Sequence, residues 1–393
     1  MSRDIVLLDG ARTAIGTFGG ALAGVPPTET AAHVARAALE RAGVEGAQIG
    51  HVVYGHVINT EPRDMYLSRV AAIEAGIPDT TPAMNVNRLC GSGAQAVVSG
   101  LQAIALGDAD FALTGGAEAM SRAPHAFQQA RSGQKMGDTK MLDMMIGALS
   151  CPFGTGHMGV TAENVAAEHQ ISREEQDAFA LTSQQRAGAA MADGRFAGQI
   201  APFTIKTRKG EHIVDTDEHP KPATTPEDLA KLRPAFAKGG TVTAGNASGI
   251  NDGAAAVVLA EAGAAERAGL KPRARMLGYA HAGVRPEVMG LGPIPAVTKL
   301  LERIGLTAAD FDVIESNEAF AAQACAVNKG LGLDPAKVNP NGGAIALGHP
   351  IGATGAILVL KCLAELERTD GAKGLVTMCI GGGQGIALAL ERI

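Results

Sequence analysis

The sequence is short of cysteine, of positive charge and of long apolar runs, and each shortage excludes a class of protein. Its five cysteines, at positions 90, 151, 325, 362 and 379, are odd in number and widely spaced, and no CxxC pair is present. Neither a disulfide framework nor a cysteine metal site is therefore expected. A net charge of −6 argues against a broad nucleic-acid surface. We find no apolar run of the roughly 18–20 residues that a membrane span needs, so no membrane partner is expected.

The N-terminal segment MSRDIVLLDGARTAIG predicts a strand followed by a turn and lacks the layout of a signal peptide. With the unpaired cysteines, this favours a reduced, cytoplasmic protein. Glycine, in contrast, is abundant: 51 residues stand in turns between apolar runs and follow no three-residue period. A chain of 393 residues, 46% of them hydrophobic, is long enough for two or three packed units.

The same order of predicted strands and helices occurs twice in the sequence. FALTGGAEAM (111–120) and GLVTMCIGGGQG (374–385) are apolar strands that end in glycines, and an alanine-rich helical stretch precedes each. GHVVYGHVI and FDVIESNEAF are earlier strands that run into polar ends. We interpret this as a duplicated α/β fold of largely parallel strand pairing. The first half takes residues 1–118 and 250–270, and the second takes 271–393.

Residues 119–249 interrupt the first half with a different pattern. A methionine-rich segment, MGDTKMLDMMIGAL, is followed by a polar helix predicted to begin at Thr161, with Asn164 in its first turn. The charged, proline-containing stretch 207–229 predicts a surface excursion. An insertion of this kind forms a lid or a ligand-binding face.

Four reactive side chains stand beside glycine-rich turns: Cys90 in RLCGSG, Asn317 in SNEAF, His349 in GGAIALGHPIGATG and Cys379 in TMCIGGGQG. Such junctions of strand, loop and helix gather at one edge of a sheet, where ligands bind. Taken singly, each has a plain structural interpretation. Cys90 could be a buried small hydrophobe instead of a nucleophile at a helix N-terminus, and His349 a hydrogen-bonded turn residue. Together, two thiols and an imidazole indicate acyl chemistry.

These segments, with AGNASGINDGAAA and SNEAFAAQA, resemble the motifs of the thiolase family, in the family's order from ARTAIGTFGG to GGGQGIA. TEPRDMYLSRVAA and MGDTKMLDMMIGAL resemble the biosynthetic β-ketothiolases of broad short-chain specificity, which supply 3-ketoacyl-CoA for polyhydroxyalkanoate synthesis. The resemblance implies a layered α-β-α-β-α fold. It also implies homodimers that often pair into homotetramers.

The resemblance further implies an acyl-CoA acyltransferase that condenses acetyl-CoA with acetyl-CoA or a short acyl-CoA, reversibly and without a tightly bound cofactor or a metal. Cys90 would carry the acyl group, its thiolate favoured by the helix N-terminus and by His349. Cys379 would move the α-proton. Asn317 would hold a water beside the enolate oxygen, and the N–H groups of Cys90 and Gly381 would hold the tetrahedral oxyanion.

Coenzyme A would lie against the insertion. By resemblance, Ser248 hydrogen-bonds the pantetheine, and Lys221 stands near the adenine end, where many relatives carry an arginine. The channel would be lined by Leu149, His157, Met158, Phe236, Ala244, Ala319 and Phe320. For Phe236 and Phe320 core packing is an equal alternative.

The remaining cysteines and methionines receive mostly structural interpretations. Cys325 and Cys362 are expected in the core, and Cys151 in the core or along the pantetheine path without a catalytic role. The methionines at positions 141, 144 and 145 are expected to pack in the core or, less strongly, to line an adaptable pocket.

Two other enzyme classes compete. A degradative 3-ketoacyl-CoA thiolase would use the same residues, because the chemistry is reversible. A decarboxylating condensing enzyme of the same fold lacks a cysteine like Cys379, so the intact CIGGGQG segment argues against it. A non-enzymatic scaffold would leave the four reactive side chains without a joint purpose.

Overall fold

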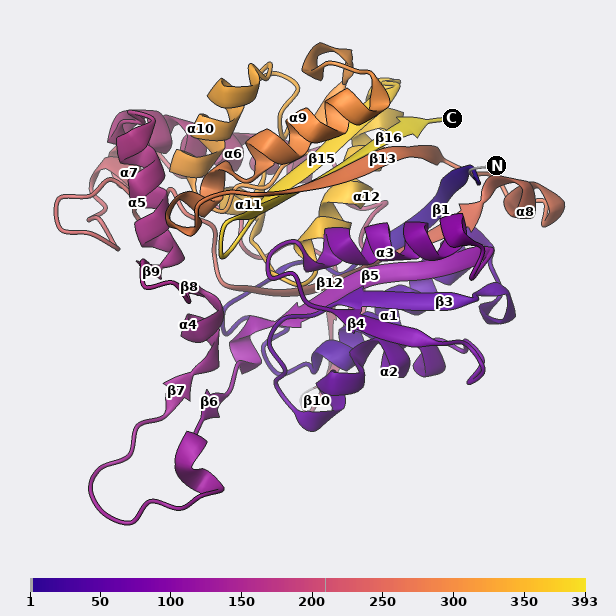
Figure 1. The fold of residues 1–393 in the computed structure, drawn as a ribbon, viewed down its shortest axis with the longest axis horizontal. Coiled ribbons are helices and arrows are strands. Elements are labelled where there is room, and N and C mark those ends of the chain that lie inside the picture. Colours follow the sequence, from indigo (N-terminus) through magenta and orange to yellow (C-terminus); the bar gives the residue numbers. More distant parts are fainter. Residues whose placement is uncertain (1–2, 209) are drawn as a thin grey trace.

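The computed structural model describes residues 3–208 and 210–393. The strands of the first half are β1 (Ile5–Arg12), β2 (Gly16–Thr17), β3 (His51–Gly55), β4 (Ala83–Val86), β5 (Phe111–Ala119) and β12 (Asn251–Glu261). Those of the second half are β13 (Ala274–Gly283), β14 (Val313–Ser316), β15 (Lys373–Ile380) and β16 (Gln384–Arg392). They form one path in the order β14–β15–β16–β13–β1–β12–β5–β3–β4, with β2 beside β12 (Figure 1).

The two halves repeat one topology. The neighbours β1–β12–β5–β3 correspond to β13–β16–β15–β14, and the halves meet where β1 pairs with β13 over two residues, Val6 and Leu7. The expectation of largely parallel pairing is wrong. The pairs β3–β5, β3–β4 and β14–β15 are parallel, but β12 and β16 run antiparallel to all of their neighbours. In the second half a short turn joins β15 to β16, which only antiparallel neighbours allow, and in the first half the insertion stands between β5 and β12.

Helices cover the strands in three layers. The first half contributes α1 (Pro27–Ala42), α2 (Leu67–Glu74), α3 (Ser92–Leu106) and α8 (Ala262–Arg267). The second half contributes α9 (Pro293–Ile304), α10 (Ala321–Leu331), α11 (Ala344–Leu347) and α12 (Thr354–Thr369). Figure 1 shows α3 and α12 between the two groups of strands, with α1 and α2 on one outer side and α9 on the other. The expected α-β-α-β-α arrangement is confirmed.

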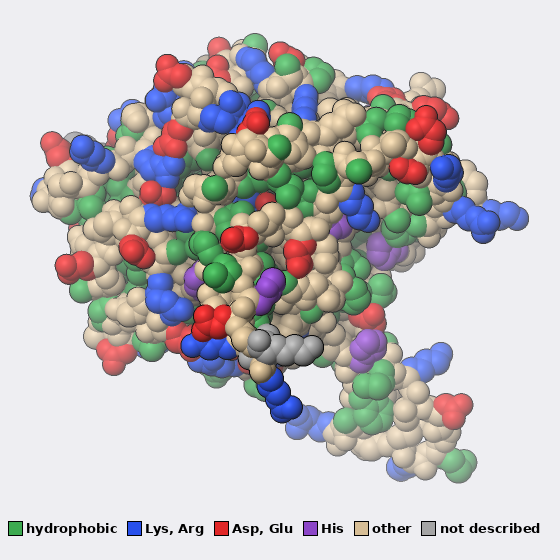
Figure 2. Space-filling model, turned by 180° about the vertical axis from the view of Figure 1, so that it is seen from behind, with side chains coloured by type: hydrophobic (Ala, Val, Ile, Leu, Met, Phe, Trp, Pro, Cys, Tyr) green, Lys and Arg blue, Asp and Glu red, His purple; other side chains and the backbone are tan. Residues whose placement is uncertain are grey.

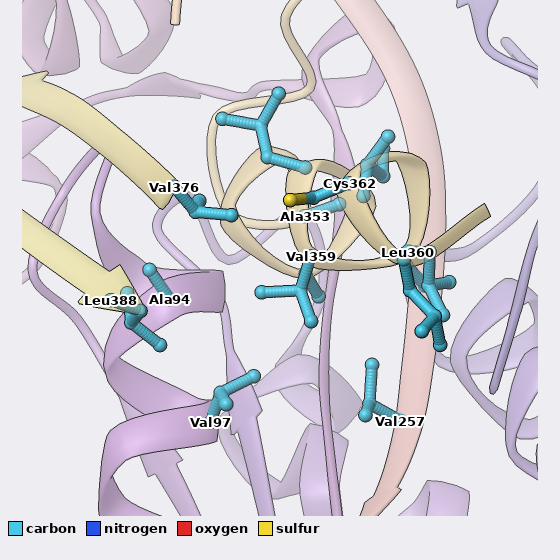
Figure 3. Packing of buried hydrophobic residues seen from close by; sticks show 14 of the residues in the cluster. Ala94, Val97, Val257, Ala353, Val359, Leu360, Cys362, Val376 and Leu388 are labelled. Atoms are coloured by element: carbon cyan, nitrogen blue, oxygen red, sulfur yellow. The ribbon is translucent and has the colours of Figure 1, made fainter. Parts of the chain in front are cut away.

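The middle layer forms the largest apolar core. Side chains from α3, α12 and both groups of strands pack there, among them Cys362, which is fully buried as expected (Figure 3). The helices α3 and α12 cross closely because Gly93 and Gly355 have no side chain. A Cβ atom at Gly355 would lie 2.1 Å from the backbone nitrogen of Ala94. A helix between two sheets is apolar around most of its circumference, which explains the sequence of α12.

One helix of this middle layer contradicts the expectation that no apolar run reaches the length of a membrane span. The segment Leu89–Leu106 reaches a mean hydropathy of 1.3 over 18 residues, enough by length and composition for a membrane span. It comprises α3 and the turn before it, and 61% of the segment is buried inside the molecule. A core helix that contacts β3, β5 and α12 accounts for this composition.

The insertion packs on the second half of the fold. Its helices α5 (Met158–Glu168) and α6 (Arg173–Ala192) contact α10, and α6 also contacts α11. The expected helix start at Thr161 is wrong, because α5 begins three residues earlier, after His157, whose Nδ1 atom accepts from the N–H of Gly159. The predicted polar helix is two helices, separated near Gln170, which has a φ of 53°.

The rest of the insertion is made of hairpins and short helices. The stretch 207–229 contains parts of a hairpin, β10 (Phe203–Thr207) and β11 (Gly210–Val214), and α7 (Pro226–Ala230); residue 209 of this prediction lies outside the described residues. The other elements are β6 (His125–Ala126), β7 (Leu142–Asp143), α4 (Met144–Ala148), β8 (Ser150–Cys151) and β9 (Gly156–His157).

An arm formed by residues 123–148, with β6, β7 and α4, leaves the body of the molecule. Figure 2 shows it standing clear of the body, with hydrophobic and charged side chains on its surface. Met141 is 60% exposed and Met144 is 41% exposed, so neither packs in a core or lines a pocket as the sequence suggested. Met145 is partly buried against the apolar cluster of Ile58, Met120 and Ile351.

Candidate active site

The four reactive segments lie at the ends of strands. Cys90 follows β4 and precedes α3, Asn317 directly follows β14, and Cys379 lies in the last residues of β15. Gly381 begins the turn from β15 to β16, and His349 lies in the loop between α11 and α12. These positions belong to both halves of the fold, so duplication brings the two thiols to one place.

The turn that presents Cys90 is held by its own neighbours. Leu89, just before the cysteine, has a φ of 46°, a conformation rare for a residue with a side chain. The hydroxyl of Ser92 accepts from the N–H of Arg88 at 2.9 Å and donates to the carbonyl of Leu89 at 2.6 Å. These bonds fix a sharp strand-to-helix turn, with the cysteine at the entry of α3.

The Cys90 thiol is protonated in the resting site. Burial raises its pKa, and the nearby carboxylate of Glu118 raises it further. The backbone N–H groups of Gly381 and of Cys90 itself donate toward the sulfur and oppose this effect. The N–H groups at the start of α3 and in the turn after β15 thus favour the thiolate in the expected direction, but burial outweighs them and holds the pKa above its ordinary value. Cys90 needs a base to become a nucleophile.

His349 has the properties of such a base. Burial lowers its pKa to about 4, so its imidazole is neutral near pH 7. The N–H of its backbone donates to Oδ1 of Asn251 at 2.9 Å, and its Nδ1 atom lies 2.7 Å from Oγ1 of Thr354. Its Nε2 atom lies 3.4 Å from Nδ2 of Asn317. The ring is neutral and held at three points, and the nitrogen that carries no proton can accept one.

Cys379 lies deeper than Cys90. Its side chain is fully buried in an apolar cluster that includes Met158 and Met289. Burial raises the pKa of this thiol well above its usual range, and its electrostatic coupling to Cys90 raises it further. The chain neighbours of the two cysteines are in contact, because a Cβ atom at Gly91 would lie 2.5 Å from Cδ1 of Ile380. A thiol in this environment is a weak acid, and its thiolate is a strong base.

One cavity of about 370 Å³ joins these residues to the insertion. Cys90, His349 and Gly381 form part of its wall, whereas the fully buried Asn317 and Cys379 do not line it. The predicted coenzyme A residues that line it are Leu149, His157, Met158, Phe236, Ala244, Ser248, Ala319 and Phe320. The structure thus places eight of the nine predicted contacts around the space that Cys90 faces.

Aromatic rings form one side of the cavity. The rings of His157 and Phe236 stack with centroids 4.8 Å apart, and Phe320 meets Phe236 edge-on at 6.1 Å. A Cβ atom at Gly159 would lie 2.2 Å from the Phe236 ring, so this glycine lets the ring lie flat against α5. Phe236 and Phe320 therefore both pack against the protein interior and line the cavity. Core packing and cavity lining, given as alternatives for these two residues, both apply.

Some predicted residues lie elsewhere. Lys221 is exposed outside the cavity wall, and its backbone N–H donates to Oε1 of Gln184 at 2.7 Å. Cys151 packs in the apolar cluster with Met158. Burial raises the pKa of its thiol, but hydrogen bonds from Thr155 and Phe153 together outweigh this effect and lower it. Cys325 is buried as expected, and burial raises its pKa to about 12. In residues 3–208 and 210–393, no group of three His, Cys, Asp or Glu side chains stands in position to hold a metal ion.

Sequence reasoning missed several residues that shape the site. Glu118 is buried and accepts from the N–H groups of Val57 at 3.1 Å and Ile58 at 3.0 Å. Asn251 and Thr354 hold His349. Both lie inside the thiolase-like segments AGNASGIND and HPIGATG, where a polar residue among small and apolar ones was the signal that could have identified them. The cavity wall also includes Met120, Met289 and Ile351.

Known proteins share this architecture throughout. Models of the N-terminal and C-terminal thiolase domains match residues 5–263 and 270–392. The β-ketothiolase BktB of Cupriavidus necator is 61% identical over 394 residues, covering 100% of both chains. The crystal structure of the Bacillus anthracis acetyl-CoA acetyltransferase has a TM-score of 0.97 at 45% identity, covering 100% of this chain and 99% of that one. The human mitochondrial 3-ketoacyl-CoA thiolase in complex with CoA has a TM-score of 0.97 at 43% identity, covering 100% and 98%.

The chain belongs to the thiolase family, and the resemblance carried by its motifs is confirmed. It is an enzyme, an acyltransferase of the thiolase class.

Proposed function

We propose that this thiolase joins acetyl-CoA to a second acetyl-CoA or a short acyl-CoA in a reversible Claisen condensation, giving a 3-ketoacyl-CoA and free CoA. One observation carries the proposal: Cys90, His349 and Gly381 face a single apolar cavity, and Cys379 lies two residues before Gly381 at the end of β15. The names of two relatives, a β-ketothiolase and an acetyl-CoA acetyltransferase, support it. Coenzyme A would be a substrate, with no tightly bound cofactor or metal.

In the first half-reaction, Nε2 of His349 takes the proton of the Cys90 thiol. The sulfur attacks the thioester carbon, and the N–H groups of Gly381 and Cys90 stabilise the oxyanion. The intermediate collapses with cleavage of the bond to the CoA sulfur, leaving acyl-Cys90. The departing CoA thiolate takes the proton of Cys379. Loss of one oxyanion donor typically costs about 10²–10³ in rate.

In the second half-reaction, the Cys379 thiolate removes the α-proton of the bound acetyl-CoA. Its raised pKa makes it a strong enough base. The enolate oxygen is stabilised by the proton now on Nε2 of His349 and by a water held by Asn317, whose Nδ2 atom lies 3.4 Å from that nitrogen. The carbanion attacks acyl-Cys90, and the released sulfur recovers its proton from His349. All protons are then back where they began.

We propose a biosynthetic role with short chains, as in the supply of 3-ketoacyl-CoA for polyhydroxyalkanoate synthesis. The wall contributes Met120, Met158 and Met289, whose flexible thioethers adapt to substrates of different length. Identity to the β-ketothiolase, 61%, exceeds the 43% to the human 3-ketoacyl-CoA thiolase, which disfavours the degradative alternative.

Steady-state thiolysis tests this proposal. The kcat/KM values for acetoacetyl-CoA and 3-ketovaleryl-CoA should be similar, and that for 3-ketodecanoyl-CoA much lower. A marked preference for the longest substrate would support the degradative alternative. Failure of acetyl-CoA to acetylate Cys90, followed by mass spectrometry, would contradict the mechanism itself.

We also propose self-association, as a homodimer or homotetramer, and a cytoplasmic location. Two surfaces support self-association. Strand β4 lies at the end of the sheet path and carries Met84, 43% exposed, on an unpaired edge of the described fold. The arm exposes apolar side chains, including Met136, which is 90% exposed.

A further inference from the structure

His349 is held by two buried residues outside the proposed catalytic set. Asn251 fixes the backbone, because its Oδ1 atom accepts from the N–H of His349 at 2.9 Å. Gly348 adopts a φ of 101°, and a Cβ atom there would lie 2.5 Å from the Asn251 side chain. Thr354, the first residue of α12, meets the ring, with Oγ1 placed 2.7 Å from Nδ1. The backbone and the ring are thus fixed separately.

The hydroxyl of Thr354 decides which ring nitrogen carries the proton. It has a single proton, and it donates that proton to the carbonyl of Pro350 at 2.9 Å. Toward His349 it can then only accept, so the contact at 2.7 Å requires a proton on Nδ1. A neutral imidazole has one N–H, and Nε2 therefore has a lone pair, which accepts from Nδ2 of Asn317 at 3.4 Å.

We propose that Thr354 is a positioning residue: it keeps the proton of neutral His349 on Nδ1, so that Nε2 is the atom that takes the proton from Cys90. The inference rests on the proposed function, in which His349 is that base. During acylation, the S–H bond of Cys90 breaks, its proton forms the second N–H bond at Nε2, and the sulfur electron pair forms the bond to the acyl carbon. Throughout, the Nδ1–H bond stays on Thr354 and anchors the imidazolium.

The role proposed for Thr354 requires its hydroxyl oxygen. Thr354 is 3% exposed, so water cannot replace it. Valine has almost the same shape but no acceptor, and would leave the Nδ1–H without a partner. The ring would then rotate or move its proton to Nε2, and either change removes the base.

The test compares Thr354→Val with Thr354→Ser, which keeps the hydroxyl. Thr30→Val is the matched control: Thr30 is also buried in the first turn of a helix, and its hydroxyl donates to the carbonyl of Pro27 at 3.0 Å, with no histidine attached. For Thr354→Val we expect kcat for acetoacetyl-CoA thiolysis to fall about 10- to 100-fold with little change in KM. Thr354→Ser and Thr30→Val should stay within about threefold of the parent enzyme.

A second readout separates positioning from a merely structural role. The rate of Cys90 alkylation by iodoacetamide, mapped by peptide mass spectrometry, should fall in Thr354→Val near pH 7, where the thiol needs a base. It should return to the parent rate at high pH, where the thiolate forms unaided. Thr354→Ala should behave like Thr354→Val, and it provides the same test if the valine variant does not fold.

His349→Ala separates the role proposed for Thr354 from the role of His349 as the base in the proposed function. If it loses kcat and neutral-pH alkylation while Thr354→Val and Thr354→Ala retain both, the role of Thr354 is wrong and the proposed function stands. If His349→Ala itself retains both, His349 is not the base, and that part of the proposed function fails. If Thr354→Val loses alkylation equally at every pH, the residue acts only in packing, which also overturns the inference.

Discussion

Lys361 and Glu315 form an ion pair inside the molecule. The Nζ atom of Lys361 lies 2.7 Å from Oε2 of Glu315, and the two side chains are 2% and 0% exposed. Lys361 also donates to the carbonyl of Gly342 at 2.7 Å. The pair connects α12 to β14, two residues before Asn317, so it supports the strand that ends in the site. Burial raises the pKa of Glu315 even in the presence of Lys361.

Removing the cation alone should destabilise the fold. Lys361→Met leaves a carboxylate in the core, and breaking a buried pair in this way costs about 3–5 kcal/mol. The pKa of Glu315 in the folded variant should rise further above its unfolded value. Its protonated form is then favoured by folding, so stability should fall as pH rises through that raised pKa. Urea unfolding at fixed protein concentration measures this. Adding Glu315→Gln should recover part of the loss and remove the pH slope; a persistent slope would assign it to another group.

The crossing of α3 and α12 should not tolerate a methyl group. Gly355→Ala would place a Cβ atom 2.1 Å from the backbone nitrogen of Ala94, so one helix must move. Overpacking of this kind typically costs about 1–3 kcal/mol. Gly198→Ala is the control, because nothing lies within 4 Å of its added Cβ atom. The urea midpoint should fall for the first variant and stay unchanged for the second; equal midpoints would mean that the crossing adapts.

The neutral state of His349 should set the acid limits of activity and of stability. Its pKa is lowered from 6.5 to about 4 by burial, so kcat/KM should not fall through protonation of His349 between about pH 5 and pH 7. The unfolded chain binds this proton more readily than the folded one. The stability that His349 contributes is therefore constant above pH 6.5 and is lost as pH falls toward about 4. His349→Asn should flatten that part of the stability profile. An unaltered profile would show that other groups govern acid unfolding.

If the chain self-associates as proposed, the contact should depend on the arm. Met136 and Met141, 90% and 60% exposed, present apolar surface that a second copy of the chain can bury. We expect the double change of both residues to glutamine to shift the sedimentation coefficient toward a smaller assembly. Ile213→Gln, at a residue 57% exposed on β11, is the control and should leave the assembly unchanged. An unchanged assembly in the double variant would assign the contact to another surface, such as the edge of β4.

Motifs and apolar patterns predicted much of the fold and the candidate site, because each is local. The strands β1, β5 and β15 and the residues around Cys90 and His349 stand where their sequence segments indicated. What escaped prediction depends on packing between distant segments. Three features depend on such packing: the antiparallel positions of β12 and β16 in the sheet, the contact of α5 with α10, and the burial that raises the pKa of Cys90. The place of Lys221 near the adenine end of CoA stays a prediction, because it lies outside the cavity wall and no residue of that wall tests it.

The two thiols should fail at different steps when they are replaced. Cys90→Ser should lose acylation, because a hydroxyl lacks the acidity and nucleophilicity of a thiol. Cys379→Ser should still acylate Cys90, since attack on the first thioester needs no carbanion and a CoA thiolate can leave unaided. In that variant, proton abstraction should collapse, because the pKa of a serine hydroxyl is far above that of a thiol.

Two measurements on each variant separate these steps: trapping of acetyl-Cys90 by intact mass, and exchange of the α-protons of acetyl-CoA in deuterated buffer. Cys379→Ser should show the acetyl adduct without exchange. Acetylation at Cys379 or Cys151 with Cys90 free would reassign the nucleophile. Normal exchange in Cys379→Ser would make His349 the base for the α-proton. In that event the imidazole of His349, which contacts Thr354 and Asn317, would act as the base in both half-reactions. Cys379 would then have only a packing role beside Met158 and Met289.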